Sequence, residues 1–288
     1  AALEQWSDDQ LVRKMEEREV NISVDPTGDA DSIVEGYFVE PANVQMPLSK
    51  LFSHLQAEEA MGSETSSRPV HYLQSQNGNL ADEYKPLLDD VGIEGPAWAR
   101  EAFGQPPDVA NIWIGGGRSK TSMHKDPYEN IYLVVRGSKE FVLLPPSEAY
   151  CLHERLYSHA SWSFSPSMSS FTLVPSSPPL TLPWIPIDPL SPDLSKHPRY
   201  SLARPMKVKL NKGDMLYLPA MWFHHVSQTP DYFNPQKKEG TKAAIAVNWW
   251  TDMKYEGPFW AGLELNRRLL AQLDGREEEE EEDEEERN

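Results

Sequence analysis

The tripeptide His124-Lys125-Asp126 places an imidazole and a carboxylate two positions apart, a spacing that suits two ligands of one metal ion. If the tripeptide lies on a strand, His124 and Asp126 face the same side and Lys125 points away. A third ligand must come from elsewhere, and the pair His224-His225 follows a Pro-containing turn that offers one. Two imidazoles and one carboxylate on one face of an iron ion leave adjacent coordination positions open, as in non-haem Fe(II) oxygenases. An adjacent His pair without that geometry is more often structural.

Short runs rich in β-branched and aromatic residues must position these ligands. They occupy residues 109–117, 129–135, 139–146, 206–219 and 242–250, and Gly, Pro and Asn separate them. Many short strands with tight turns favour a double-sheet antiparallel fold. The sequence therefore predicts a mainly β protein with flanking helices and a jelly-roll core. The residues Arg136-Gly137-Ser138 predict a three-residue hairpin loop between two of the strands.

The chain divides into a core and flanking segments. Residues 1–107 predict an N-terminal region of helices and strands that packs on the core, which spans 108–255. A long Ser/Pro-rich insertion interrupts the core at 147–205, and such loops are usually functional or partly disordered. Residues 256–275 predict an amphipathic helix, which packs on its own domain or forms a homodimer contact. Residues 276–288 form an acidic tail that we expect to be disordered.

Composition restricts the class of protein. The formal net charge is −18, and residues 277–286 are ten consecutive carboxylates, which account for −10 of it. An acidic chain is a poor candidate for direct nucleic-acid binding and suits a Lys- or Arg-rich protein partner better. No apolar run approaches the roughly 18 residues that a membrane span requires. The single cysteine excludes an internal disulfide and fits the cytoplasm, or also the nucleus.

Several spaced elements together resemble the jumonji-C family of Fe(II)- and 2-oxoglutarate-dependent oxygenases. These elements are the H-x-D tripeptide, a Lys before "FVLLPP", the string "GDMLYLPAMWFH", and a strand with Asn before aromatic residues. The resemblance spans about 108–255 and implies a double-stranded β-helix, or cupin-like jelly roll. In such proteins the last iron ligand lies five residues after the Pro of that string. Because this Pro is Pro219, the resemblance selects His224 and leaves His225 on the other face of the strand.

The resemblance also implies which residues bind the cosubstrate 2-oxoglutarate, with O2 as the second oxidant. Lys139 matches the lysine that pairs with the far carboxylate, and Thr121 matches a hydroxyl donor. Asn130 and Asn248 match amides near the cosubstrate and the metal, and Tyr72 resembles a further phenol donor. A buried carboxylate is costly unless it is paired, which is why such partners are needed. We expect the tryptophans at 113, 222, 249 and 250 mainly to fill the core.

Strings outside the core, above all "WIPIDPLSPDL", resemble a lysyl hydroxylase branch of that family. This resemblance implies hydroxylation of a lysine in GTPases of the developmentally regulated GTP-binding class, with succinate and CO2 as coproducts. Two alternatives stay open: an N-methyl-lysine demethylase, and a non-catalytic cupin-like binding scaffold. A peptidase is disfavoured because no base for an activated water is evident. The run "GGGR" at 115–118 lacks the spacing of a phosphate-binding loop.

Overall fold

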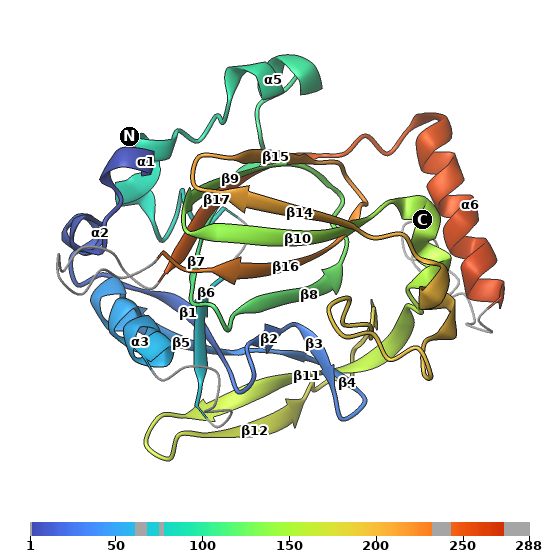
Figure 1. The fold of residues 1–288 in the computed structure, drawn as a ribbon, viewed down its shortest axis with the longest axis horizontal. Helices are drawn as coiled ribbons and strands as arrows, with labels where there is room; N and C mark the ends of the chain where they lie inside the picture. The colour runs from blue at the N-terminus through green and yellow to red at the C-terminus, as the bar shows by residue number, and fades with distance from the viewer. Residues whose placement is uncertain (1, 61–67, 75–77, 232–242, 274–288) are drawn as a thin grey trace, which may run out of the picture.

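Two facing antiparallel sheets form the centre of the computed structural model, which describes residues 2–60, 68–74, 78–231 and 243–273 (Figure 1). Four core strands of the larger sheet lie in the order β15-β9-β17-β7, and those of the smaller sheet in the order β14-β10-β16-β8. Their bounds are β7 Val109–Gly115, β8 Lys120–His124, β9 Tyr128–Arg136, β10 Ser138–Leu144, β14 Met206–Asn211, β15 Met215–Leu218, β16 Phe223–Thr229 and β17 Ala244–Asp252. The predicted jelly roll is confirmed.

The middle of the larger sheet is buried on both faces, as β17 shows. Ala246 and Trp250 pack between the two sheets, whereas Ile245, Val247 and Trp249 belong to a second core on the outer face. Because successive side chains alternate between faces, a strand buried on both sides needs a continuous apolar run. This requirement explains the sequence "AIAVNWW" at 244–250.

The N-terminal region supplies the cover for that outer face and widens both sheets. Strands β6, β1 and β5 continue the larger sheet beyond β7, and β2 pairs with β8 at the edge of the smaller one. These elements are α1 Ala2–Gln5, α2 Asp8–Met15, β1 Glu19–Asp25, β2 Asp29–Ala30, β5 Ala42–Pro47, α3 Leu48–Ala60, β6 Val70–Leu73, η1 Lys85–Leu87, α4 Leu88–Val91 and α5 Ala97–Phe103. The region is thus continuous with the core rather than merely adjacent to it.

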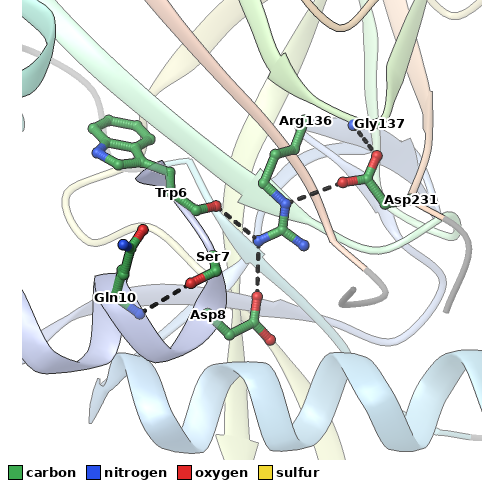
Figure 2. Close-up of polar contacts among 7 residues, drawn as sticks. All are labelled: Trp6, Ser7, Asp8, Gln10, Arg136, Gly137 and Asp231. Atoms are coloured by element: carbon green, nitrogen blue, oxygen red, sulfur yellow. Dashed lines mark hydrogen bonds and ion pairs between the residues drawn. The ribbon is translucent and has the colours of Figure 1, made fainter. Parts of the chain in front are cut away.

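Arg136 connects the N-terminal segment around α1 and α2 to the core through hydrogen bonds and ion pairs (Figure 2). Its guanidinium lies 2.8 Å from an Asp8 carboxylate oxygen, 3.2 Å from the Trp6 carbonyl oxygen and 3.1 Å from an Asp231 oxygen. Ser7 caps α2 by accepting from the Gln10 amide. Because Arg136 is buried, each of these acceptors offsets part of the cost of removing its charge from water.

The Ser/Pro-rich insertion folds into a third sheet. Its strands β11 (Arg155–Ser165), β12 (Ser170–Pro175) and β13 (Thr181–Trp184) form antiparallel pairs around β11. Strand β11 also pairs in parallel with β4 (Tyr37–Glu40) of the N-terminal region, which in turn pairs with β3 (Ser32–Val34). The 3-10 helices η2 (Pro146–Cys151) and η3 (Pro198–Leu202) lie before and after these three strands. The insertion is therefore held by a distant part of the chain.

The predicted hairpin at Arg136-Gly137-Ser138 is wrong. Strand β9 pairs with β15 and β17, and β10 pairs with β14 and β16, so the two consecutive strands belong to opposite sheets. Gly137 turns the corner between the sheets with a φ of 67°. A Cβ at this position would meet the Thr229 carbonyl oxygen at 2.5 Å, so the crossing requires glycine for space as well as for conformation.

Helix α6 (Gly257–Leu273) closes the described chain beside the insertion (Figure 1). It buries Leu270 and Ala271, while a row of large apolar side chains stays exposed: Phe259, Leu265, Leu269 and Leu273. The acidic tail lies outside the described residues. Within the described ranges, no helix has the length and apolar character needed to cross a bilayer.

Candidate active site

His124, Asp126 and His224 converge at one end of the jelly roll. The Cα atoms of His124 and His224 are paired across β8 and β16, so the two rings lie 4.1 Å apart between centroids. One Asp126 carboxylate oxygen lies 3.7 Å from Nε2 of each histidine. The three ligand atoms all lie within 4.8 Å of one another, and no other such cluster occurs among the described residues. The structure therefore brings together the three predicted ligands.

Backbone carbonyls fix both histidines in the tautomer that a metal needs. Nδ1 of His124 lies 2.8 Å from the Ser122 oxygen, and Nδ1 of His224 lies 3.0 Å from the Trp222 oxygen. A carbonyl only accepts, so each Nδ1 carries a hydrogen and each neutral ring keeps a lone pair on Nε2. Such a second hydrogen bond orients a metal-binding imidazole. Both Nε2 atoms face Asp126.

The electrostatics of the cluster also favour ligand forms. Burial would raise the pKa of Asp126, but His124 and His224 outweigh it and lower that pKa to about 2. Burial, with His124 nearby, lowers the pKa of His224 to about 4. The pKa of His124 is raised, because Asp126 outweighs the opposing effect of burial. At neutral pH the site therefore holds an ionised carboxylate and a neutral His224, which are forms that bind a divalent metal.

The H-x-D tripeptide is not wholly on a strand, contrary to the simplest expectation. Strand β8 ends at His124, and Asp126 lies in the connection to β9. The Asp126 carbonyl accepts from the Met221 amide at 2.8 Å, which ties this connection to the turn before His224. Met221 holds a φ of 65°, a conformation that is uncommon for a residue with a side chain. Lys125 points away, as expected, and its ammonium pairs with Glu154 at 2.5 Å.

A local irregularity in β8 lets Thr121 share the ligands' face. The pairing of β8 with β16 matches His124 to His224 but Thr121 to Val226, so β8 carries one extra residue there. Such a bulge shifts the inward and outward alternation by one position. Thr121 and His124, three residues apart, therefore both line the same cavity.

This cavity between the sheets contains most of the predicted cosubstrate residues. Tyr72, Thr121, Asn130 and Asn248 line it together with the three metal-site residues. The two amides are linked, because Asn248 Nδ2 donates to Asn130 Oδ1 at 3.1 Å. Asn248 Oδ1 in turn accepts from the Trp113 indole at 2.8 Å. This hydrogen-bonded chain fixes the orientation of both amide groups.

Lys139 lies fully buried on β10 next to Tyr72. Its ammonium nitrogen is 3.4 Å from the Tyr72 hydroxyl and donates to Oε1 of Gln228. Both partners are neutral, and no described carboxylate forms an ion pair with Lys139. Burial lowers the pKa of Lys139 to about 7. An anionic ligand would supply the missing countercharge, so the far carboxylate of 2-oxoglutarate fits this position.

Other aromatic residues complete the cavity. Trp113 and Trp250 are buried in the core between the sheets, as expected, and they also line the cavity together with Tyr132 and Phe141. Trp249 matches the core-filling expectation and is buried in the outer core. The sequence could not indicate whether Trp249 or Trp250 faces the site. Both faces of β17 are buried, so both positions carry a large apolar residue.

The sequence interpretation missed Trp184 and Gln228. The Trp184 ring from the insertion lies parallel to the His124 ring, with centroids 6.1 Å apart. No local pattern could connect a Ser/Pro-rich segment to the metal site. Gln228 did carry a signal, since it lies four positions after His224 on the same strand and shares its face. His225 points away from the three ligands and lines a separate cavity.

Comparisons with known proteins agree with this geometry. A family profile described as a cupin-like domain matches residues 1–257. A human protein named bifunctional peptidase and (3S)-lysyl hydroxylase JMJD7 is 38% identical over 88% of this chain and 74% of its own length. JmjC domain-containing protein E of Dictyostelium discoideum is 32% identical over 88% and 75%. An Arabidopsis thaliana protein named lysine-specific demethylase JMJ32 is 36% identical over 88% and 73%.

Proposed function

Because the chain belongs to the cupin-like, jumonji-C family, we propose that it is an Fe(II)- and 2-oxoglutarate-dependent hydroxylase of protein lysine. The observation that carries the proposal is the proximity of two features, a cavity that holds possible metal ligands and a buried lysine beside the wall of that cavity. The first is a His-Asp-His cluster with its Nε2 atoms turned inward. The second is Lys139, which contacts the cavity residue Tyr72 and forms no ion pair with a described carboxylate. The first suits iron and the second suits a dicarboxylate.

Each residue has a defined task in this proposal. His124, Asp126 and His224 hold the metal, while Lys139, Tyr72 and Thr121 orient the cosubstrate, and the Asn130–Asn248 pair lines the cavity beside them. With O2, the bound iron and 2-oxoglutarate supply the oxidising chemistry: 2-oxoglutarate becomes succinate and CO2, and one oxygen atom enters a substrate C–H bond. No side chain has to act as a nucleophile. Trp113, Tyr132 and Trp250 give the cavity an aromatic lining.

The choice of a lysine substrate rests on the name of the human relative and on charge. That relative is named a (3S)-lysyl hydroxylase, and this chain carries a net charge of −18, which attracts a basic protein segment. More specifically, we propose a lysine of a developmentally regulated GTP-binding protein as the target. We further propose a cytoplasmic or also nuclear location, with no direct binding to nucleic acid or membrane.

Demethylation of N-methyl-lysine is the second candidate, because the Arabidopsis relative is named a lysine-specific demethylase. The same cavity could admit a methyl C–H bond in place of a side-chain methylene. The peptidase activity in the human relative's name would require a base that activates a water molecule. Among the described residues, no Asp, Glu or His other than the three ligands lines the cavity to activate a water molecule.

Mass spectrometry of a candidate GTPase incubated with the protein, Fe(II) and 2-oxoglutarate tests the proposal. We expect a lysine peptide that gains the mass of one oxygen atom, and His124→Ala or Asp126→Ala should abolish the product. Lys125→Ala is the matched control, because Lys125 lies between two ligands but points away from them. Normal hydroxylation by the ligand variants would overturn the assignment. Loss of a methylene from a methylated peptide would identify a demethylase.

A non-catalytic scaffold would give a different result. Such a protein would keep the cavity and could bind a metal, but it would not convert 2-oxoglutarate to succinate, whichever substrate is added. Measuring succinate in the same incubations, together with the metal content of the protein, therefore separates the scaffold from both enzymes.

We also propose that helix α6 forms a homodimer contact. Phe259, Leu265, Leu269 and Leu273 are each about half exposed or more, which is unusual for a row of large apolar side chains on one helix. Analytical ultracentrifugation of the protein and of Leu269→Glu tests this contact. We expect a dimer that the substitution converts to a monomer, and a monomeric wild type would exclude it.

A further inference from the structure

Gln228 is the closest polar neighbour of the cosubstrate lysine and is held in a single orientation. Gln228 and Lys139 are directly paired across β16 and β10, and both side chains are buried. Oε1 of Gln228 accepts from the Lys139 ammonium, and Nε2 donates to the Gly116 carbonyl at 2.9 Å. An ammonium only donates and a carbonyl only accepts, so the amide cannot be turned around without losing both bonds.

The glycine run at 115–117 provides the space for this amide. A Cβ on Gly115 would lie 2.3 Å from Nε2 of Gln228 and 2.6 Å from Cδ2 of Tyr72. Any larger residue would therefore displace the two side chains that contact the Lys139 ammonium. This run does not have the spacing of a phosphate loop, and its structural role is instead the close approach of Gln228 to the chain.

We propose that Gln228 is a positioning residue that holds the Lys139 ammonium toward the far carboxylate of 2-oxoglutarate. This inference rests on the proposed function. An ammonium has three hydrogens to donate. Gln228 and the Tyr72 hydroxyl take two of them, so one remains for the cosubstrate, and its direction is fixed by the other two.

An amide suits this task better than a carboxylate would. A neutral carbonyl stabilises the protonated lysine but leaves its charge uncompensated, so the cosubstrate carboxylate supplies the countercharge. A carboxylate at position 228 would form the ion pair itself and compete with the cosubstrate. An apolar residue would remove the acceptor, and the protonated form of Lys139, already disfavoured by burial, would become rarer.

The test measures 2-oxoglutarate binding by calorimetry to Fe(II)-loaded protein without O2, from pH 6 to pH 9. A hydrogen bond to a charged group contributes enough that Gln228→Leu should weaken binding by about ten- to a hundredfold at neutral pH. We expect the affinity of Gln228→Leu to begin falling at a lower pH than that of the wild type. Gln228→Glu has nearly the same shape and should also bind weakly, but its affinity should persist to a higher pH, because the added carboxylate raises the pKa of Lys139.

Opposite pH shifts from two variants at one position are not expected from a purely structural role. Ser227→Ala is the matched control, since Ser227 is the preceding residue on β16, faces the other side and pairs with Glu140. Iron content should be unchanged in all variants. Wild-type affinity and an unshifted pH dependence in both Gln228 variants would overturn this inference while the proposed function stands. A wild-type protein that binds no 2-oxoglutarate would overturn both.

Discussion

The cosubstrate contact that we propose for Lys139 is accompanied by a cost to stability. It is fully buried and its described partners are neutral, so folding lowers its pKa from the usual 10.5 to about 7. At a pH below about 7, the folded protein must hold the charged Lys139 ammonium in its interior. As pH rises from 7 toward 10.5, the folded protein releases this proton while the unfolded chain still holds it, so the cost is progressively relieved.

We therefore predict that Lys139→Met alters how the free energy of unfolding depends on pH. Between pH 7 and pH 9.5 the wild type should gain stability relative to the variant, with a slope of at most about 1.4 kcal/mol per pH unit. Urea denaturation of both proteins at several pH values measures the difference, in which other titrating groups cancel. Parallel curves would show that Lys139 keeps its ordinary pKa. The variant should also lose 2-oxoglutarate binding.

The convergence of the three candidate metal ligands could be predicted from sequence, because their spacing is either local or fixed relative to a recognisable string. His124 and Asp126 are two positions apart, and His224 follows Pro219 at a distance typical of the family. Gln228 was missed although it shares the face of His224. The reason is that the role of a buried glutamine can be inferred only when its cross-strand neighbour, here Lys139, is known.

At the scale of elements, Gly137 shows what a local pattern cannot decide. A short Gly-containing connection between two β runs is compatible with a hairpin in one sheet and with a corner between two sheets. The distinction depends on which strands become neighbours, and the neighbours of β9 and β10 come from residues 206–252. The strands were therefore predictable and their pairing was not.

We predict that Gly137→Ala destabilises the protein more than Gly213→Ala does. Both glycines have a positive φ, 67° and 89°, so both substitutions cost roughly 1–2 kcal/mol of backbone strain. Only at Gly137 does the new Cβ also meet a backbone atom, the Thr229 carbonyl oxygen, whereas Gly213 has open space around it. The difference in the free energy of unfolding should be about 1–3 kcal/mol. Equal losses in chemical denaturation would contradict the role of Gly137 as a crowded corner.

The whole molecule adds connections that sequence patterns did not indicate. Parallel pairing of β11 with β4 joins residues 155–165 to residues 37–40, and no periodicity in either segment specifies the partner. The sequence of the insertion predicts a Ser/Pro-rich loop, because its strands are half exposed and have a polar composition. Its order comes from long-range pairing, which single-segment propensities do not contain.

The net charge of −18 predicts salt-dependent association with a basic protein substrate. Ten of the carboxylates lie at residues 277–286, so the effect should depend partly on that segment. Charges more than about 8 Å apart are largely screened at physiological salt. We expect the KM for a lysine-bearing protein to rise severalfold between low and high salt, with kcat little changed. Removing residues 277–288 should reduce this rise, and an unchanged salt dependence would show that the tail does not contribute.

Trp184 joins three parts of the molecule at the metal site. It belongs to β13 of the insertion, its ring centroid lies 4.3 Å from that of Phe38 on β4, and it is parallel to His124 on β8. Its indole nitrogen also donates to the Ser122 hydroxyl at 3.1 Å. Because Ser122 supplies the carbonyl that orients His124, Trp184 supports this ligand from two directions.

We predict that Trp184→Leu weakens metal binding by about 10- to 100-fold, the usual effect of losing a group that orients a ligand. The matched control is Trp162→Leu on β11 of the same insertion. Trp162 is similarly half-buried but contacts Phe171, and it has no described contact with the three ligands. Competition with a chelator measures the metal affinity of both variants. If Trp162→Leu weakens it equally, the effect comes from general loosening of the insertion; if neither does, His124 is held by the Ser122 carbonyl alone.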